Sequence, residues 1–103
     1  MMYKVVPSER ARKDILDIIG YITSELDSPE AARKLLIALY KEMNSLDTMP
    51  KRFAFVSDER LAQMGIRSIP VKNYIIFYTV DEQKKSVTII RVMYSKRDWA
   101  NLL

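Results

Sequence analysis

Two long stretches in the first half of the chain carry apolar residues at steps of three and four positions. The first apolar stripe is Ala11, Ile15, Ile18, Ile19, Ile22 and Leu26, and the charged residues that fall largely outside it are Arg10, Lys13, Asp14, Asp17 and Glu25. The second stripe is Ala32, Leu35, Leu36, Leu39, Met43 and Leu46. This spacing predicts amphipathic helices over residues 8–26 and 29–46, which form an antiparallel hairpin that can cover one face of a sheet.

Both predicted helices begin with a start signal. Ser8 stands at the N-cap position of the first helix, and Glu9 lies near its positive end. Before the second helix, Ser28 can act as a cap and Pro29 suits the first helical position, where its missing N–H costs nothing. The short connection between the helices supports the hairpin.

Four shorter stretches, residues 3–6, 66–71, 74–80 and 87–94, are rich in β-branched and aromatic residues, which favours strands. The last two are separated by the polar turn 81–86 and predict a β-hairpin. Simple alternation in the last strand predicts one face with Val87, Ile89, Arg91 and Met93, and another with Thr88, Ile90, Val92 and Tyr94. We therefore expect the face that the helices leave free to be concave, partly apolar and supplied with an arginine.

Residues 47–65 form a connector without clear periodicity. An unstructured loop of this length is unusual in a compact domain. Its second half, DERLAQMG, is compatible with one helical turn that Gly65 closes. The sequence leaves open whether the connector is an ordered cover or a contact surface.

Length and composition narrow the class of protein. A chain of 103 residues predicts a single domain over residues 1–103. The absence of cysteine excludes disulfides and thiolate zinc sites, and the absence of histidine removes the usual general base at neutral pH. Because no apolar run resembles a membrane span or a signal peptide, we expect a cytoplasmic protein that does not engage a membrane. We expect neither a metal nor another cofactor.

The positive charge lies in the last third of the chain. Residues 66–103 contain seven Lys and Arg against three acids, whereas residues 1–65 hold ten of each sign, so the net charge of +4 belongs to the predicted sheet and tail. A pI of about 9.4 with a localised surplus favours an anionic partner, either nucleic acid or an acidic protein segment. Arg67 and Arg91 lie inside strand-like runs, where an arginine usually meets an anionic partner. The alternatives are an internal salt bridge or a side chain that extends along the apolar surface to water.

Seven residues of this region form a candidate anion-binding set: Arg67, Lys72, Tyr78, Arg91, Tyr94, Lys96 and Arg97. Guanidinium groups bind phosphate oxygens in pairs, lysine adds a point charge, and tyrosine offers a ring and a hydroxyl. Sheet packing is the alternative interpretation for the two tyrosines, and a solvated tail for Lys96 and Arg97. Trp99 is either a core residue or a stacking platform.

These stretches, in this order, resemble the RelE/ParE superfamily of bacterial toxins from type II toxin–antitoxin operons. The resemblance covers the full length and is carried by the N-terminal YKVVP, the two helices, the Ile66-Arg67 strand, NYIIFYTVD and RVMYSKRDW. It implies an α+β fold in which a helical hairpin packs on a mainly antiparallel sheet, in the order βααβββ with a short C-terminal helical turn. It also implies that the sheet is mixed, with the N-terminal strand alongside the later ones.

The resemblance implies a toxin that arrests growth and is neutralised by a cognate antitoxin. The acidic, amphipathic C-terminal segment of that antitoxin would wrap the helices and the sheet edge, and only the antitoxin complex would bring the toxin to operator DNA. RVMYSKRDW is closer to the ParE branch, whose members inhibit DNA gyrase and are not enzymes. Residues for target binding would then be Lys72, Tyr78, Arg91, Lys96, Arg97 and Trp99.

The alternative is the RelE branch of ribosome-dependent mRNA endonucleases. In that branch, arginines at the positions of Arg67 and Arg97 are implied to hold the scissile phosphate. The terminal tyrosine of RelE-like nucleases falls near Leu103 in this sequence, so Tyr94 would have to act as the acid or base. This departure, with the absence of histidine, favours the gyrase inhibitor.

Overall fold

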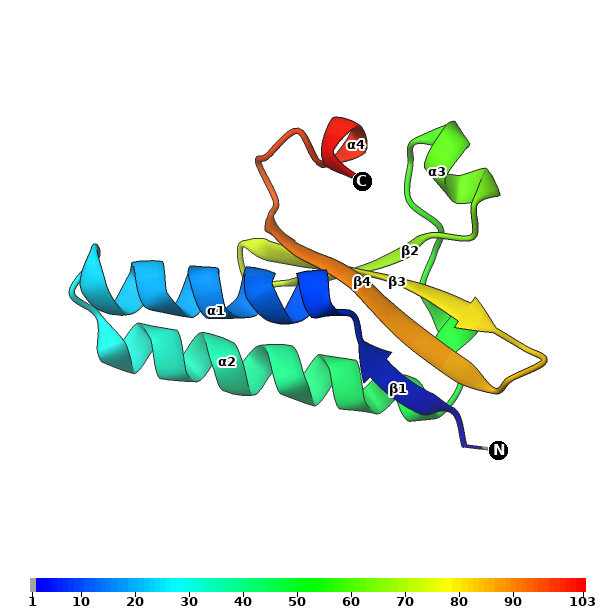
Figure 1. Cartoon of the computed structure of the whole chain (residues 1–103), viewed down its shortest axis with the longest axis horizontal. Coiled ribbons are helices and arrows are strands. Elements are labelled where there is room, and N and C mark those ends of the chain that lie inside the picture. The colour runs from blue at the N-terminus through cyan, green and yellow to red at the C-terminus, as the bar shows by residue number, and fades with distance from the viewer. Residues whose placement is uncertain (1) are drawn as a thin grey trace.

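The computed structural model describes residues 2–103 and has the predicted α+β architecture (Figure 1). Its strands are β1 (Lys4–Pro7), β2 (Arg67–Val71), β3 (Tyr74–Asp81) and β4 (Ser86–Tyr94). Its helices are α1 (Glu9–Ser24), α2 (Pro29–Asn44), α3 (Glu59–Gln63) and α4 (Trp99–Leu102), with short 3₁₀ turns η1 (Ser45–Asp47) and η2 (Pro50–Arg52). Within the described residues, no helix has the length and apolar character needed to cross a membrane.

The four strands form one mixed sheet in the order β1-β4-β3-β2. β1 runs parallel to β4, while the β4–β3 and β3–β2 pairs are antiparallel. β1 ends at Pro7, which lies opposite Ile89. Proline lacks the N–H that would continue the ladder, which explains why the strand stops there. The N-terminal strand therefore borders the last strand, as expected, and pairs with only the first half of it.

The helical hairpin follows the predicted pattern with three local differences, one of which is that α2 ends at Asn44 and η1 follows it. The Ser8 hydroxyl caps α1 by accepting from the N–H of Ala11 at 3.0 Å, whereas Ser28 makes no side-chain capping bond to α2. α1 ends at Ser24, before the predicted end at Leu26. Leu26 therefore lies beyond the helix and is 56% exposed instead of belonging to the core.

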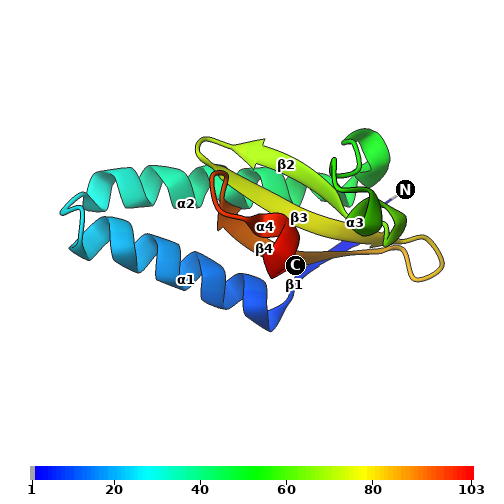
Figure 2. The ribbon, with the colours of Figure 1, turned by 90° about the horizontal axis from the view of Figure 1, so that it is seen from above.

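The two long helices cover one face of the sheet, and the main core lies between them and the strands. Fully buried members of this core include Ala11, Leu39, Leu46, Ile76, Tyr78, Val87 and Ile89. Both views show the tip of the helical hairpin projecting beyond the sheet, on the side of the turn that joins β2 to β3 (Figures 1 and 2). This projection leaves part of the hairpin without a strand beneath it.

A β-bulge at Ile90 corrects the predicted alternation of the last strand. Phe77 of β3 pairs with Arg91 and Tyr78 pairs with Ile89, so Ile90 is the extra residue. Beyond the bulge the faces are exchanged: Val92 joins Val87 and Ile89 in the main core, while Ile90 and Met93 pack on the other side of the sheet. The predicted alternation therefore holds as far as Ile90 and is wrong beyond it.

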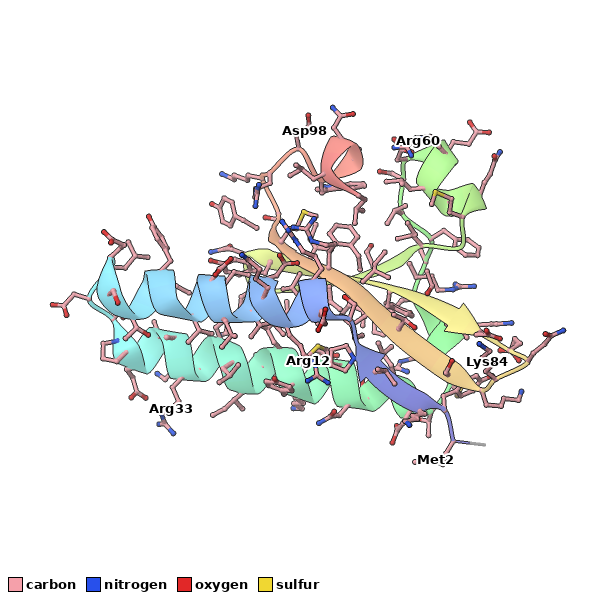
Figure 3. All side chains as sticks on the ribbon, viewed as in Figure 1. Met2, Arg12, Arg33, Arg60, Lys84 and Asp98 are labelled. Carbon is pink, nitrogen blue, oxygen red and sulfur yellow. The ribbon has the colours of Figure 1, made fainter. Side chains whose placement is uncertain are left out.

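The second face of the sheet is partly apolar, as the sequence predicted. A smaller core covers part of it, formed by Val56, Leu61, Ile66, Phe77 and Met93, with Trp99 and Leu103 packed against it. α3 and α4 lie above this face, on the side of the sheet away from α2 (Figure 1). Arg60 of α3 reaches towards α4, where its Nη2 donates to the Ala100 carbonyl at 3.1 Å (Figure 3).

The connector is an ordered cover. Its middle forms a β-bridge between Phe55 and Arg67 at the edge of β2. As predicted, its second half is a helical turn: the Asp58 carboxylate caps α3 by accepting from the N–H of Leu61 at 3.0 Å, and Gly65 follows with φ of +85°. A positive φ of this kind favours glycine. The connector thus pairs with the edge strand β2 through Phe55 and contributes Val56 and Leu61 to the second core.

Candidate functional site

The structure distributes the predicted site residues over several places. Arg67 and Tyr78 hold the connector, Arg91 faces α1, Trp99 belongs to the second core, and Lys72, Tyr94 and Arg97 lie around a groove, with Lys96 exposed on the adjoining tail. The residues of the first three places contact other parts of the same chain, whereas those around the groove and on the tail lie at the surface.

Arg67 is occupied by the connector. Its Nη1 donates to the carbonyl oxygens of Phe53 at 2.6 Å and Lys51 at 3.1 Å. Its guanidinium carbon also lies 3.9 Å from the ring centroid of Phe55, a cation–π contact. These contacts tie the Nη1 group and the plane of the guanidinium to the connector, so Arg67 fixes the connector to β2.

Tyr78 performs the same task from the next strand. Its side chain is fully buried in the main core, and its hydroxyl donates to the Pro50 carbonyl at 2.6 Å. Burial raises the pKa of Tyr78, against the lowering effect of the nearby Arg67 and Arg52. The packing interpretation therefore holds for Tyr78, which has no access to an external ligand.

Arg91 forms a bidentate ion pair with Asp14 of α1. The Nε–Oδ2 and Nη2–Oδ1 distances are 2.7 and 3.0 Å, and the two side chains are only 11% and 8% exposed. The Asp14 carboxylate also accepts from the N–H of Val92 at 3.0 Å. The prediction that Asp14 lies outside the buried stripe is wrong. β1 stops at Pro7 and leaves the second half of β4 without a neighbouring strand on that side, and the Asp14 carboxylate accepts the backbone N–H that such a strand would have bonded.

Trp99 lies where the core interpretation places it. Its ring packs against Phe77 with centroids 5.3 Å apart and an interplanar angle of 41°. It closes the second core from the side of α4, together with Ala100 and Leu103. An indole in this position supports the sheet and offers little face for stacking on a ligand.

Lys72, Tyr94 and Arg97 line a groove of about 780 Å³, together with residues of the hairpin tip and of the end of the sheet. We call it the hairpin groove. Its remaining lining residues are mainly apolar or aromatic: Ile18, Tyr21, Ile22, Leu26, Ala31, Leu35 and Tyr74, with Asp17 and Asn73. Three of the predicted residues therefore do come together.

Strand register and one turn position these three side chains. Lys72 adopts φ of +53° in the β2–β3 turn, and the N–H of Ser95 donates to the carbonyl of the neighbouring Asn73 at 2.8 Å. This bond holds the start of the tail against the turn. Tyr94 pairs with Tyr74 across the sheet, and their rings meet edge to face with centroids 5.7 Å apart.

The tyrosines of the groove influence one another. Burial raises the pKa of Tyr74, and the phenol groups of Tyr94 and then Tyr21 raise it further. The groove thus combines a protonated phenol, two cationic side chains and an apolar floor. Such a surface suits a ligand that carries both a large apolar group and an anionic group.

Arg67 does not belong to this groove. Arg67 is the first residue of β2, and Val71 is the last. Val71 pairs with the groove residue Tyr74, so Arg67 lies about 13 Å along the strand from the end that borders the groove. The three predicted catalytic residues, Arg67, Tyr94 and Arg97, are therefore not gathered. Among residues 2–103, no group of three acidic side chains could hold a metal ion.

A family model described as the ParE toxin of the type II toxin–antitoxin system parDE matches residues 5–99. The chain belongs to the ParE toxin family. It is accordingly the toxin component of a type II toxin–antitoxin system, and the resemblance found in the sequence is confirmed. No curated protein sequence matches the chain.

Solved structures share the fold of this ParE-family toxin. A chain of the chromosomal ParDE toxin–antitoxin system from P. aeruginosa is similar with a TM-score of 0.74 and 18% identity, over 92% of this chain and 98% of that chain. A mutant E. coli RelE toxin in the free state is similar with a TM-score of 0.63 and 17% identity, over 99% of this chain and 93% of that chain. A RelBE toxin–antitoxin complex from Mycobacterium tuberculosis is similar with a TM-score of 0.60 and 20% identity, over 91% of this chain and 92% of that chain.

Sequence reasoning missed part of the toxin's groove. The sequence assigns Leu26 to the helix stripe, Tyr74 to a strand, and Tyr21 to no site, yet Tyr21 and Leu26 are more than half exposed and all three line the groove. A helix rises about 1.5 Å per residue and a strand about 3.3 Å, so the 16-residue helices are no longer than β3 and β4. The groove therefore results from where the hairpin lies on the sheet, which leaves no local signal in the sequence.

Proposed function

We propose that this ParE-family toxin arrests growth by inhibiting DNA gyrase, without catalysing a reaction itself. The observation that carries the proposal is the ParE family match over residues 5–99, because the resemblance of the tail segment to the ParE branch implies gyrase as the target. The exposed tail residues Lys96 and Arg97 are available for a protein contact of this kind.

The chemistry of RNA cleavage supports the same choice. Cleavage requires a base for the 2′-hydroxyl and an acid for the leaving oxygen, beside cations that hold the phosphate. The chain has no histidine, and Arg67 is engaged with backbone carbonyls away from Tyr94. Asp17 is the one carboxylate among the residues that line the groove.

A second candidate, the ribosome-dependent mRNA endonuclease, is favoured by one observation. Lys72, Tyr94 and Arg97 line the same groove, which therefore holds a phenol and two cations. In this alternative, Tyr94 would move the proton and Arg97 would hold the phosphate.

The proposed regulator is a cognate antitoxin acting in the cytoplasm. Its acidic, amphipathic C-terminal segment would fold onto the helices and the sheet edge of the toxin, which carries a net charge of +4. Operator DNA would be reached only through the antitoxin. Two of the similar structures come from toxin–antitoxin systems.

One experiment separates the two targets. The toxin is induced in growing bacteria, and the same culture is assayed for mRNA 5′ ends and for gyrase-linked DNA breaks. We expect DNA breaks without codon-phased mRNA cuts, and relief of both the breaks and the growth arrest in the Lys96→Ala/Arg97→Ala variant. Arg33→Ala, an exposed cation of α2, is the matched control and should remain toxic. Codon-phased cuts without DNA breaks would establish the endonuclease instead.

A further inference from the structure

We propose that the outer face of the helical hairpin, the face turned away from the sheet, is a self-association surface on which two copies of the toxin pack antiparallel. The occupant of this face is a second copy of the chain, and the pair would form a reversible two-fold dimer built from four long helices. The dimer would form whichever target the toxin has, because its surface shares no residue with the hairpin groove or the tail.

Apolar side chains lie on the outer face of both long helices, although each helix already buries one stripe in the main core. Leu16 of α1 is 72% exposed, and Ile37 and Tyr40 of α2 are 57% and 45% exposed. Ile19 and Leu36 lie one turn from them and are only partly buried. We call these five residues the outer patch. Apolar residues beyond the core-facing stripe of a helix favour a partner that removes them from water.

The outer patch lies at the middle of the hairpin. Leu16 is eight residues before Ser24, the end of α1, and Ile37 is eight residues after Pro29, the start of α2. In two antiparallel helices, positions equally far from the connection stand at the same level. Leu16 and Ile37 therefore lie at one level near the centre of the face, and Tyr40 extends the patch by one turn along α2.

Gly20 gives a second indication of a helix partner. It is exposed in the interior of α1, and a Cβ at this position would meet no atom within 4 Å, so packing inside the chain does not require glycine there. Glycine in a helix interior is less favourable than alanine. A bare backbone at the surface does, however, allow a second helix to approach closely.

Charge distinguishes the two ends of the hairpin. Residues 17–36, next to the connection, carry four acids and two bases, a net charge of −2. Residues 9–16 and 37–44, at the other end, carry four bases and three acids, a net charge of +1, and Asp14 among these acids is already paired with Arg91. Antiparallel packing brings the negative end of each copy onto the positive end of the other, whereas parallel packing would place like charges together.

A two-fold axis across the middle of the hairpin accommodates the apolar and the charged groups together. Leu16 and Ile37 would lie close to this axis and pack against their own copies. Glu30 is one residue from the start of α2 and Lys41 is three residues from its end, and both are exposed. Glu30 of one copy would therefore face Lys41 of the other. α4 lies on the side of the sheet away from α2 (Figure 1), so both tails would remain outside the interface.

The size of the face predicts a weak dimer. A 16-residue helix is about 24 Å long, and two adjacent helices are about 20 Å wide. Two such faces would bury about 1,000 Å² in total, which is near the lower limit for a specific interface. We therefore expect a micromolar dissociation constant and exchange with the monomer.

The test uses the purified full-length toxin, with its mass measured by sedimentation equilibrium over a micromolar concentration range. We expect a reversible monomer–dimer equilibrium. Ile37→Glu should weaken association by about tenfold or more, because it places two carboxylates together at the centre of the interface. Met64→Glu, at a similarly exposed apolar residue beyond α3, is the matched control and should change association by less than about twofold. Thermal melts establish that both variants are folded.

A charge reversal tests the antiparallel arrangement. Glu30→Lys and Lys41→Glu should each weaken association by about threefold, because each places like charges opposite one another at two symmetric sites. Their combination should restore association to within about twofold of the native toxin, since opposite charges then face each other again. The ion pair of Glu30 with Arg33 within one copy would not produce this recovery.

Cross-linking provides a second measurement that does not depend on a destabilising substitution. The chain has no cysteine, so an Ile37→Cys variant carries a single thiol. A short bis-maleimide should join two copies of this variant through their thiols, whereas Met64→Cys should remain largely monomeric under the same conditions.

A native toxin that stays monomeric over the whole concentration range would overturn the proposal, as would a dimer that persists in folded Ile37→Glu. If the free toxin is monomeric and Ile37→Glu weakens binding of the antitoxin instead, the outer patch belongs to that partner and the proposal is wrong. A combined charge variant that associates no better than the single variants would overturn the antiparallel arrangement. These measurements do not involve gyrase, so their failure is distinguishable from a failure of the proposed target.

Discussion

The two ends of β2 and β3 use the same kinds of side chain in opposite ways. At the end nearest the connector, Arg67 and Tyr78 donate hydrogen bonds to three backbone carbonyls and hold the connector in place. At the other end, Lys72 and Tyr94 remain at the surface around the hairpin groove. The difference lies in the surroundings: an ordered connector covers one end, and the projecting helices leave the other open.

This comparison shows that residue type alone does not identify a functional cation in this toxin. An arginine within a strand must find an acceptor, and the nearest available acceptors are often backbone carbonyls or a carboxylate of the same chain. Arg67 takes carbonyls and Arg91 takes Asp14. Of the cations in the predicted site, those of the turn and tail, Lys72, Lys96 and Arg97, are left for a partner.

The largest expected effect comes from the ion pair between Asp14 of α1 and Arg91 of β4. Asp14→Ala leaves the nearly buried Arg91 without its partner and the N–H of Val92 without an acceptor. We expect unfolding free energy to fall by about 3–5 kcal/mol, measured by urea denaturation. Asp17→Ala, an exposed acid of the same helix, is the control and should change stability by less than about 0.5 kcal/mol.

The Asp14 result can be sharpened with a double variant. Replacing both partners, as in Asp14→Leu/Arg91→Met, removes the uncompensated charge and should recover much of the lost stability. If Asp14→Ala were as stable as the native toxin, the pair would not be the structural link between α1 and β4. Arg91 would then return to the residues available for a target.

The main elements were predictable because their signals are local. The apolar stripes of α1 and α2 and the β-branched runs of β3 and β4 appear within a few residues of one another in the sequence. The bulge at Ile90 left no such signal, since Ile89 and Ile90 suit either face of a sheet. Burial of Asp14 depended on where β1 stops, which is a property of the assembled sheet.

The candidate site was predictable only in part, for a related reason. Lys72, Tyr94 and Arg97 could be grouped because they lie at the turn and end of adjacent strands. The path of the connector, which decides the roles of Arg67 and Tyr78, is a long-range feature without periodicity. The groove itself forms between segments far apart in the sequence, such as Leu26 and Asn73.

A pair of tyrosine variants tests the comparison directly, with a smaller expected effect. Tyr78→Phe removes a 2.6 Å hydrogen bond and leaves the Pro50 carbonyl without that donor, so stability should fall by about 1–3 kcal/mol. Tyr94→Phe changes an exposed hydroxyl and should have almost no effect on stability. Urea denaturation measures both, and hydrogen exchange around Pro50 should increase only in Tyr78→Phe. Equal losses in the two variants would contradict the distinction between the ends.

The smallest expected effect concerns Glu82, an exposed residue of the β3–β4 turn that contacts side chains from three segments of the chain. Its carboxylate accepts from the Tyr3 hydroxyl at 2.7 Å and forms ion pairs of 3.1 Å with Lys51 of the connector and with Lys85. These partners, the Tyr3 hydrogen bond first, lower the pKa of Glu82 from 4.5 to about 2.

A carboxylate with a lowered pKa stabilises the folded state above its unfolded pKa and loses that contribution as it becomes protonated. The contribution of Glu82 is therefore complete above pH 4.5 and disappears as pH falls towards about 2. We expect Glu82→Gln to be less stable than the native toxin at pH 7, by a small amount because the site is exposed, and the two denaturation midpoints to converge between pH 4.5 and about 2. A difference that persisted unchanged at pH 2 would mean that the amide disturbs packing, and that charge at Glu82 does not hold the connector.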